Sequence, residues 1–277
     1  MKFRKKMAVC LMALCAAIPC AGMAQEWQTP CVTQPYDYSY TDDERQVVVD
    51  VMERNGVVCY VADVQIARPE QLRAVIAREN GNGSTQALSD IVAGQNAVLA
   101  INGDDYGTHR YGTIIRNGHP LRAADTTRNM LIVDQNGDFS VRIDRKNEKP
   151  KALSAELMDN GTWQTFEFGP ALVENGQACA FSKAFDLIST KPTRREPRTA
   201  IGQIGTLHYV VVVADGRQEG YSIGMTLPEL QELMLEIGAK TALNLDGGGS
   251  AEMWFNGEVI SRPSGGTERK ITDIICF

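Results

Sequence analysis

The sequence lacks the features that mark several large classes of protein. After its first 24 residues it has no apolar run that approaches the roughly 20 residues needed to cross a membrane. It has no CxxC pair and no Cys/His spacing typical of a zinc site. Its formal net charge of −6 argues against nucleic acid as a partner, because binding to phosphate backbones needs an excess of Lys and Arg. It also has no internal repeat and no low-complexity segment.

What remains is the composition of an ordinary globular protein preceded by a targeting segment. The 277 residues are 43% hydrophobic and 22% charged, and a chain of this length can bury a substantial core. Residues 1–24 are typical of a signal peptide, with a basic start, a short apolar run over 7–18 and small residues before the end. We expect cleavage after Ala24 and a periplasmic or secreted protein. Lipid attachment at Cys20 is the alternative, which the preceding proline disfavours.

Four cysteines remain after such a cleavage, namely Cys31, Cys59, Cys179 and Cys276. In an exported protein four cysteines permit two disulfides, in any of three pairings. The alternative is that some are buried free thiols, which is common for cysteine.

Local patterns predict a chain rich in hairpins. Asn-Gly pairs at 55–56, 117–118, 136–137 and 256–257 each lie between β-rich runs, the strongest short signal for a hairpin. We expect an extended lead-in over 25–43 and one domain over 44–277. Helices are predicted from Pro69 to Arg78 and over 86–93, 151–158 and 227–237. The basic stretch 182–197 is expected to be a solvated surface loop.

The second half of the chain predicts a βαβ unit. The run 207–214 is apolar on both faces, so it should be a central strand. The helix at 227–237 and a strand at 241–246 follow. Asp215 and Asp246 would then lie at one edge of the sheet, where ligands bind in open α/β sheets. The predicted fold class is α+β, with a mixed β-sheet core and flanking helices.

A triple glycine follows the last strand of this unit. Within 241–256, apolar residues alternate with Asn244 and Asp246, and three glycines and Ser250 come next. Such a loop places a carboxylate beside free backbone amides, an arrangement that suits an anion. The alternative is an Asx-type turn in which Asp246 accepts hydrogen bonds from the glycine amides. A second strand end, after 97–101, carries Asn102, Asp104 and Asp105.

These motifs together resemble the phosphodiester glycosidase family. The central one is Asn244-Leu-Asp-Gly-Gly-Gly-Ser250, and further stretches that match the family pattern in order are 100–103, 168–176, 197–202, 215–218, 224–227 and 269–275. The resemblance covers roughly 60–277. It departs at 104–106, where many members have Gly-Phe-Phe-like residues, and at Glu252, where animal members have a small hydroxyl residue.

The resemblance implies hydrolysis of a sugar-1-phosphodiester, such as an N-acetylglucosamine-1-phosphodiester glycan, at the sugar–oxygen bond. Such a reaction needs cations for the phosphate and a carboxylate for an oxocarbenium-like transition state. We expect Asp246 to be the catalytic carboxylate and Asp215 its partner. Residues expected to hold the phosphate or the sugar are Arg198, Arg217, Asn244, Gly247, Gly248, Gly249, Ser250, Asn102, Asp104, Asp105 and Arg269.

Two other functions stay open at this point. One is a catalytically silent module that binds a phosphorylated glycan, and the other is a metal-dependent phosphodiesterase that cuts the phosphorus–oxygen bond. No cofactor is expected to be required, although Asp104 and Asp105 could hold calcium. Arg198 and Arg217 could instead form ion pairs with Asp215 or Asp246. The expected partner is the phosphoglycan substrate.

Overall fold

The structure is a computed structural model that describes residues 25–77, 84–181 and 191–277. The predicted signal peptide, 1–24, lies outside the described residues. Within the described ranges, no helix is long and apolar enough to cross a membrane.

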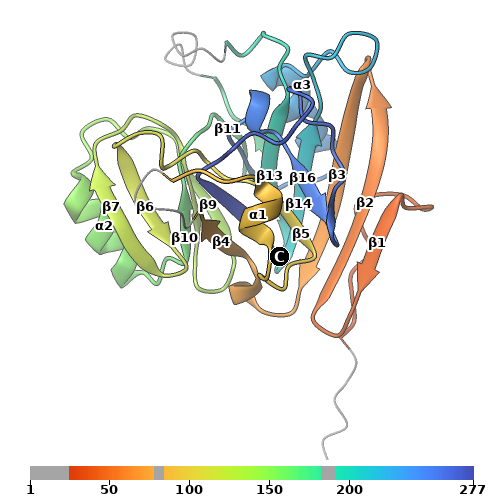
Figure 1. The fold of residues 1–277 in the computed structure, drawn as a ribbon. Helices are drawn as coiled ribbons and strands as arrows, with labels where there is room; N and C mark the ends of the chain where they lie inside the picture. The colour runs from red at the N-terminus through yellow and green to blue at the C-terminus, as the bar shows by residue number, and fades with distance from the viewer. Residues whose placement is uncertain (1–24, 78–83, 182–190) are drawn as a thin grey trace, which may run out of the picture.

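An eight-stranded sheet runs through the molecule (Figure 1). Its strands, in spatial order, are β1 (Tyr38–Thr41), β2 (Arg45–Arg54), β3 (Val57–Ile66), β14 (His208–Ala214), β13 (Arg198–Gly205), β15 (Thr241–Asn244), β11 (Ala171–Glu174) and β12 (Gln177–Ala178). Strand β14 is central, as its apolar sequence predicts. Its alternate side chains enter two different cores, Tyr209 and Val211 on one face and Val210 and Val212 on the other.

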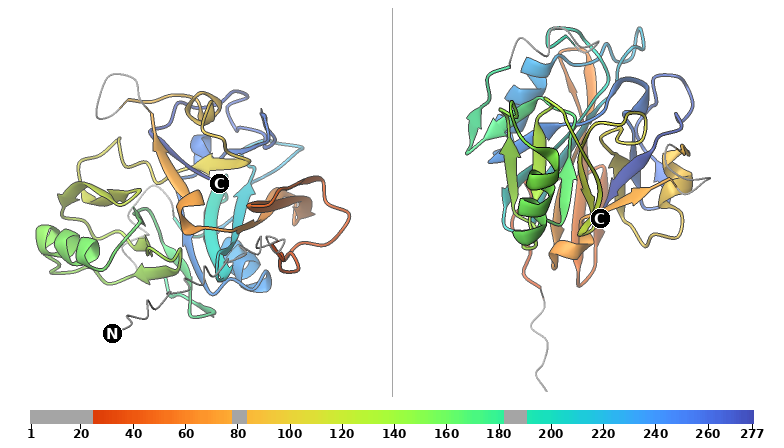
Figure 2. Two further views of the ribbon diagram at one scale, coloured as in Figure 1. Left: turned by 90° about the horizontal axis from the view of Figure 1, so that it is seen from below. Right: turned by 90° about the vertical axis from the view of Figure 1, so that its left-hand side faces the viewer.

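Smaller sheets cover one face and extend the molecule sideways. A five-stranded sheet has the order β17 (Glu258–Val259), β16 (Met253–Phe255), β5 (Leu99–Asn102), β18 (Asp273–Cys276) and β4 (Arg73–Ile76). A three-stranded sheet has the order β10 (Gln164–Phe166), β8 (Met130–Val133) and β9 (Phe139–Arg142), and β6 (Gly112–Arg116) pairs with β7 (His119–Ala124). Figure 2 shows these layers from two further sides.

Three α-helices complete the described fold: α1 (Leu88–Val92), α2 (Pro150–Asp159) and α3 (Leu227–Glu236). Helix α3 covers the second face of the large sheet, because Leu230, Leu233 and Met234 pack into the core that holds Val210 and Val212. Thr226 begins this helix with the predicted capping box, in which its hydroxyl accepts from the amide of Glu229. Helix α1 packs on the five-stranded sheet.

The predicted hairpins are confirmed, whereas the mixed sheet is wrong. All four Asn-Gly pairs join antiparallel neighbours, and both turn residues have positive φ at 55–56, 117–118 and 256–257. Every strand pairing in the described ranges is antiparallel. Strands β14 and β15 do point the same way and α3 does connect them, but β13 lies between them and is antiparallel to both.

Two local predictions also need correction. The predicted helix over 69–78 is a short 3₁₀ turn, η1 (Pro69–Gln71), followed by β4, because the β4 residues pair with β18 at the sheet edge. The segment 25–43, predicted to be extended, includes the strand β1, which pairs with β2. The four cysteines are all free thiols, so the disulfide prediction is wrong and the alternative of free thiols describes the structure.

Candidate active site

The ends of four strands meet around the triple glycine. Asn102, at the end of β5, joins them: its amide donates to the Asp246 carbonyl at 2.7 Å and its side-chain oxygen accepts from the Thr199 hydroxyl on β13 at 2.7 Å. The same oxygen accepts from the backbone amide of Glu252 at 3.3 Å. Asn102 is 1% exposed. It therefore supports the loop and does not line the cavity above it.

The glycine loop forms the Asx-type turn. The Gly247 amide donates to the Asp246 carboxylate at 2.8 Å, and the Gly248 amide donates to the Pro197 carbonyl at 2.9 Å. Two of the glycine amides therefore already donate hydrogen bonds within the protein. This leaves fewer free amides to bind an anion than the sequence predicts. Glycine is required at 247 because a Cβ there would lie 2.6 Å from the Pro197 oxygen, and at 248 because φ is +60°.

A cavity of about 300 Å³ opens over this loop. Its lining residues are Asp105, Arg128, Phe168, Arg194, Glu196, Arg198, Arg217, Asp246, Gly247, Gly248, Gly249 and Arg269. Five arginines face three carboxylates here, an excess of two positive charges in a chain whose net charge is −6. A local field of this sign attracts anions.

Two of these arginines are held in place by a carboxylate that the sequence analysis overlooked. Glu196, 4% exposed, accepts from Arg217 through one oxygen and from Arg194 through the other, the latter at 2.6 Å. Arg198 is 2% exposed and donates to the Met225 carbonyl at 3.0 Å. The predicted alternative, in which Arg198 and Arg217 pair with Asp215 or Asp246, is therefore not what the structure has.

The cavity arginines lie close enough together for their charges to lower the pKa of Arg198. Burial lowers the pKa of Arg198 to about 10 against the attraction of Glu196, and the charges of Arg217 and Arg194 lower it further. An anion in the cavity would relieve this repulsion. Such a site gains electrostatic free energy from binding a phosphate.

Two of the three carboxylates that line the cavity have a raised pKa. Burial raises the pKa of Asp246, while the Ser250 hydroxyl, the Gly247 amide and the Arg269 charge oppose the rise. Burial also raises the pKa of Asp105 to about 6, and the charge of Asp246 adds to it. Two interacting carboxylates of raised pKa in one cavity are suited to proton transfer near neutral pH.

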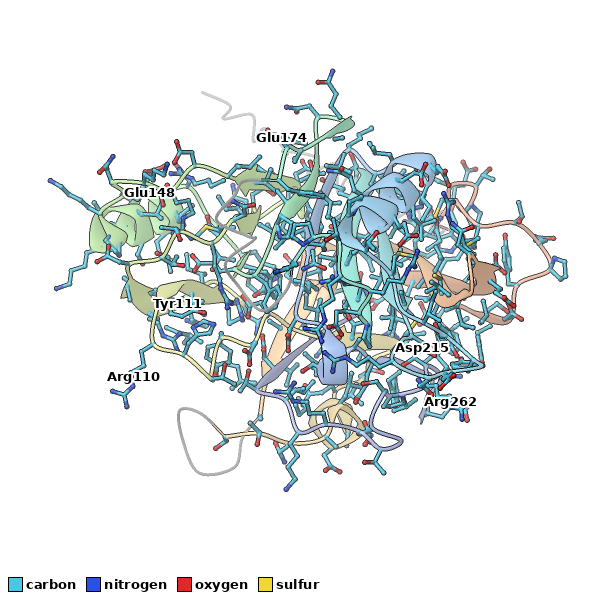
Figure 3. The ribbon with its side chains drawn as sticks, turned by 90° about the horizontal axis from the view of Figure 1, so that it is seen from above. Arg110, Tyr111, Glu148, Glu174, Asp215 and Arg262 are labelled. Atoms are coloured by element: carbon cyan, nitrogen blue, oxygen red, sulfur yellow. The ribbon has the colours of Figure 1, made fainter. Side chains whose placement is uncertain are left out.

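Asp215, the predicted partner of Asp246, does not line the cavity. Its carboxylate accepts from the Tyr221 hydroxyl at 2.9 Å and from the Arg262 amide at 3.0 Å. Burial raises its pKa to about 6. Figure 3 shows Asp215 beside Arg262, well away from Tyr111 and Glu148. Its contacts are those of a residue that anchors two loops.

Three other predicted residues lie behind the cavity wall. Asp104 is fully buried and binds Arg116 at 2.6 Å and the Glu167 amide at 2.6 Å. Asn244 donates to the Gly169 carbonyl at 2.8 Å and is 1% exposed, and Ser250 is 2% exposed. Arg198, Arg217, Arg269, Asp105, Asp246 and the three glycines are the predicted residues that the structure brings together.

Glu252 occupies an unusual position next to this group. One oxygen of its buried carboxyl accepts from the Arg269 amide at 3.0 Å, and the other has no hydrogen-bond partner among the described residues. Burial raises its pKa to about 8. Its carboxyl therefore holds the backbone that carries one of the cavity arginines.

Arg128 and Phe168 are cavity residues that the sequence analysis did not single out as site residues. The Arg128 guanidinium carbon lies 4.8 Å from the ring centroids of both Tyr111 and Phe168. Arg194 and Glu196 belong to the basic stretch 182–197 that was expected to be a solvated loop. Residues 182–190 lie outside the described residues, but 194 and 196 line the cavity. Phe168 begins the stretch 168–176 that matches the family pattern, whereas Arg128, Arg194 and Glu196 belong to no matched stretch and are assigned only by the fold.

The acidic residues do not gather as metal ligands. In the described ranges, no three His, Cys, Asp or Glu side chains are placed to hold a metal ion. The predicted calcium pair is split, since Asp104 is bound by Arg116 and only Asp105 faces the cavity.

Comparisons with known proteins identify relatives of the chain. It is 32% identical over 121 residues to an uncharacterized SPbeta prophage-derived protein, YomE, of Bacillus subtilis (strain 168), and 34% identical over 110 residues to human N-acetylglucosamine-1-phosphodiester alpha-N-acetylglucosaminidase. These alignments cover 43% and 37% of this chain and 18% and 20% of those relatives. The chain thus spans about a fifth of their length.

Solved structures share the fold. The zebrafish N-acetylglucosamine-1-phosphodiester alpha-N-acetylglucosaminidase catalytic domain, auto-inhibited by its pro-peptide, matches with a TM-score of 0.65 over 84% of this chain and 82% of that chain, at 18% identity. A hypothetical protein from Synechocystis matches with a TM-score of 0.63 over 84% of this chain and 62% of that chain, at 16% identity.

The family model agrees with these likenesses and covers most of the site. The model for phosphodiester glycosidases matches residues 95–277, about two thirds of the sequence. That range includes all three cavity carboxylates and all five cavity arginines. The chain therefore belongs to the phosphodiester glycosidase family.

Proposed function

We propose that the protein hydrolyses a sugar-1-phosphodiester at the sugar–oxygen bond and releases the free sugar and a phosphomonoester. The observation that carries the proposal is the cavity over the triple glycine, which combines an excess of arginines with two carboxylates of raised pKa. Family membership supports the same reaction class. The human relative, which is named for N-acetylglucosamine-1-phosphodiesters, suggests N-acetylglucosamine as the first sugar to test.

The arginines would hold the phosphodiester group. Arg198 and Arg217 lie on the Glu196 side of the cavity, and Arg128 and Arg269 also line it. Guanidinium groups bind phosphate oxygens in pairs of parallel hydrogen bonds. A phosphate held in this way cannot rotate, so its sugar is presented to the carboxylates in one orientation.

Asp246 and Asp105 would carry out the chemistry. Asp246 accepts from the Gly247 amide and lines the cavity with Arg269, so we assign it the attack on the anomeric carbon or the activation of water. Asp105 would carry the proton that passes to the leaving phosphate oxygen. Asn102, Asn244 and Ser250 are assigned as positioning residues, and Asp215 as an anchor for the loops at Tyr221 and Arg262.

The proposed reaction uses no metal ion. Asp104, which could have helped to hold calcium, is already bound on both oxygens by Arg116 and the Glu167 amide. The arginines can neutralise the phosphate charge in place of a cation. Incubation with EDTA should leave the rate unchanged, and a loss that calcium or magnesium restores would contradict this part of the proposal.

We also propose that the protein is exported. The support is the signal-peptide pattern over 1–24, which lies outside the described residues. Amino-terminal sequencing of the mature protein should begin at Gln25. A start at Met1, or a lipid on Cys20, would contradict the expected cleavage.

Hydrolysis in water labelled with oxygen-18 tests the reaction. N-acetylglucosamine-1-phosphodiesters and other sugar-1-phosphodiesters would be offered to the wild type and to Asp246→Asn. We expect the label on the released sugar and a loss of turnover of about a thousandfold in the variant. Asp43→Asn, at an exposed position far from the cavity lining, is the matched control and should keep full activity.

The same experiment separates the other functions. Label on the phosphate would show phosphorus–oxygen cleavage and overturn the glycosidase proposal in favour of a phosphodiesterase. Absence of turnover on every donor, with binding retained, would favour a glycan-binding module.

A further inference from the structure

The cavity arginines are not all held in the same way. Arg198 donates from two of its nitrogens to backbone carbonyls, at 3.0 and 2.8 Å. Arg217 donates from Nε to Glu196, whose other oxygen accepts from Arg194. Part of the hydrogen-bonding capacity of these three arginines is therefore already used within the protein.

Arg128 keeps most of its donors. Within the described ranges it forms no ion pair, and its guanidinium makes two long contacts, both from Nη1 and both at 3.5 Å, to Nε2 of His109 and to the Glu167 carbonyl. Its Nε and Nη2 donate to none of the described residues. A guanidinium can bind a phosphate through two parallel hydrogen bonds, so Arg128 has a free edge with which to do so.

Aromatic side chains hold this arginine instead. Its guanidinium carbon lies 4.8 Å from the ring centroid of Tyr111 and 4.8 Å from that of Phe168. A cation over the face of an aromatic ring is attracted by the ring quadrupole, and this contact uses no N–H donor. The two rings therefore fix the guanidinium while its donors stay free to bind a ligand.

The Tyr111 ring is itself fixed. It stacks on the imidazole of His109, with centroids 3.7 Å apart and ring planes 1° apart. Burial lowers the pKa of His109 to about 4, and the charge of Arg128 lowers it further, so the imidazole is neutral at pH 7 and does not repel the guanidinium. The Tyr111 carbonyl accepts from Arg122 at 2.8 Å. Ring and backbone are thus held before a ligand binds, which lowers the entropic cost of binding.

Arg128 lies next to the groups assigned to the chemistry. It lines the cavity together with Asp105 and Asp246. Burial raises the pKa of both carboxyl groups, and the charge of Arg128 opposes the rise in each. A phosphate bound to Arg128 would therefore lie beside the two carboxylates, where the proposed reaction needs it.

We propose that Tyr111 is a positioning residue, which holds Arg128 through its ring face so that this arginine binds the substrate phosphate with its free donors. The inference rests on the proposed function. Tyr111 lies outside the stretches that match the family pattern, and it does not line the cavity over the glycine loop. Its effect on the substrate passes through Arg128.

The face of the ring, and not its hydroxyl, is the feature to test. Tyr111→Leu removes the face, whereas Tyr111→Phe keeps it. With a sugar-1-phosphodiester as substrate, we expect Tyr111→Leu to raise KM about tenfold and to change kcat by less than about threefold. Tyr111→Phe should return KM to within about twofold of the wild-type value. Equal effects of the two variants would overturn the proposal.

A matched control comes from a second tyrosine that packs on an arginine. The Arg45 guanidinium carbon lies 5.8 Å from the ring centroid of Tyr40, on β1, at the other end of the molecule from β6 (Figure 1). Tyr40→Leu removes a contact of the same kind far from the cavity. It should leave both KM and kcat unchanged.

A double-mutant cycle shows whether Tyr111 acts through Arg128. Arg128→Gln should raise KM at least as much as Tyr111→Leu, and Tyr111→Leu added to Arg128→Gln should raise it by less than about twofold more. A further rise in KM of about tenfold in the double variant would overturn the proposal, because the ring would then act on another group.

Binding of inorganic phosphate tests the assignment without turnover. By titration calorimetry at pH 7, the wild type, Tyr111→Phe and Tyr40→Leu should agree in affinity within about twofold, and Tyr111→Leu should bind about tenfold more weakly. Equal affinities of the wild type and Tyr111→Leu would overturn the role of Tyr111. If this order is found but no sugar-1-phosphodiester is hydrolysed, the proposed reaction fails and the positioning role stands.

Discussion

Replacing Glu252 with glutamine should change how the stability of the protein depends on pH. The carboxyl is buried, one of its oxygens has no partner among the described residues, and its pKa is raised from the usual 4.5 to about 8. Between these two values the folded chain keeps a proton that the unfolded chain has released. Unfolding therefore releases a proton in this window, and raising the pH favours the unfolded state.

The expected size of the effect follows from the width of the window. One pKa unit corresponds to about 1.4 kcal/mol, so the unfolding free energy of the wild type should fall by up to about 3 kcal/mol, relative to Glu252→Gln, from about pH 5 to about pH 7. The glutamine keeps an acceptor for the Arg269 amide and has no charge to bury. All other titrating groups are shared, so their contributions cancel in the difference.

Urea denaturation at a series of pH values measures this difference. Glu258→Gln, at an exposed position on β17, is the matched control, and its difference from the wild type should not vary with pH. A constant difference for Glu252→Gln as well would refute the reasoning. It would mean that water reaches the carboxyl and lets it ionise at its ordinary pKa.

Four further outcomes are expected. Arg217→Gln should raise KM for a phosphodiester about tenfold and change kcat less, because it removes a cavity cation whose carboxylate partner keeps a second arginine. Gly247→Ala should abolish turnover while the protein stays folded by circular dichroism, because its Cβ would collide with the Pro197 carbonyl. Arg116→Met should lower the unfolding free energy in urea by about 3–5 kcal/mol, because two buried carboxylates lose their shared partner. Alkylation of the unfolded, unreduced mature chain should modify all four cysteines, as counted by mass spectrometry, and a dithiothreitol-dependent melting temperature would contradict their free state.

Elements encoded by neighbouring residues could be predicted from the sequence. The Asn-Gly turns and the capping box of α3 depend on a few adjacent residues, so the hairpins and the helix start were predicted correctly. Strand order was not, because β13 pairs with both β14 and β15 through contacts that no local pattern records. The helix predicted at 69–78 failed for the same reason, since the strand β4 depends on β18, about 200 residues away.

The residues of the candidate site also fall into two groups, those that a local motif marks and those that only the fold brings together. The glycine motif marked Asp246 because the spacing of Asn, Asp and glycine is contained in one short stretch. Asp105 and Asp215 both follow predicted strands, and only the arrangement of the sheets decides which of them faces the cavity. Arg128 follows no motif and reaches the site through packing between two aromatic rings. A residue of this kind becomes visible only in three dimensions.

The arginine-rich cavity also has a consequence for the end of the catalytic cycle. In the proposed reaction the substrate phosphate carries one negative charge, whereas the phosphomonoester left behind carries about 1.5 to 2 near neutral pH. Five arginines in a small, partly enclosed space hold the more highly charged product more tightly than the substrate. We therefore expect departure of the product, rather than bond cleavage, to set the turnover rate. Added salt screens these charges. It should therefore raise kcat, because the product leaves faster, and also raise KM, because the substrate binds more weakly.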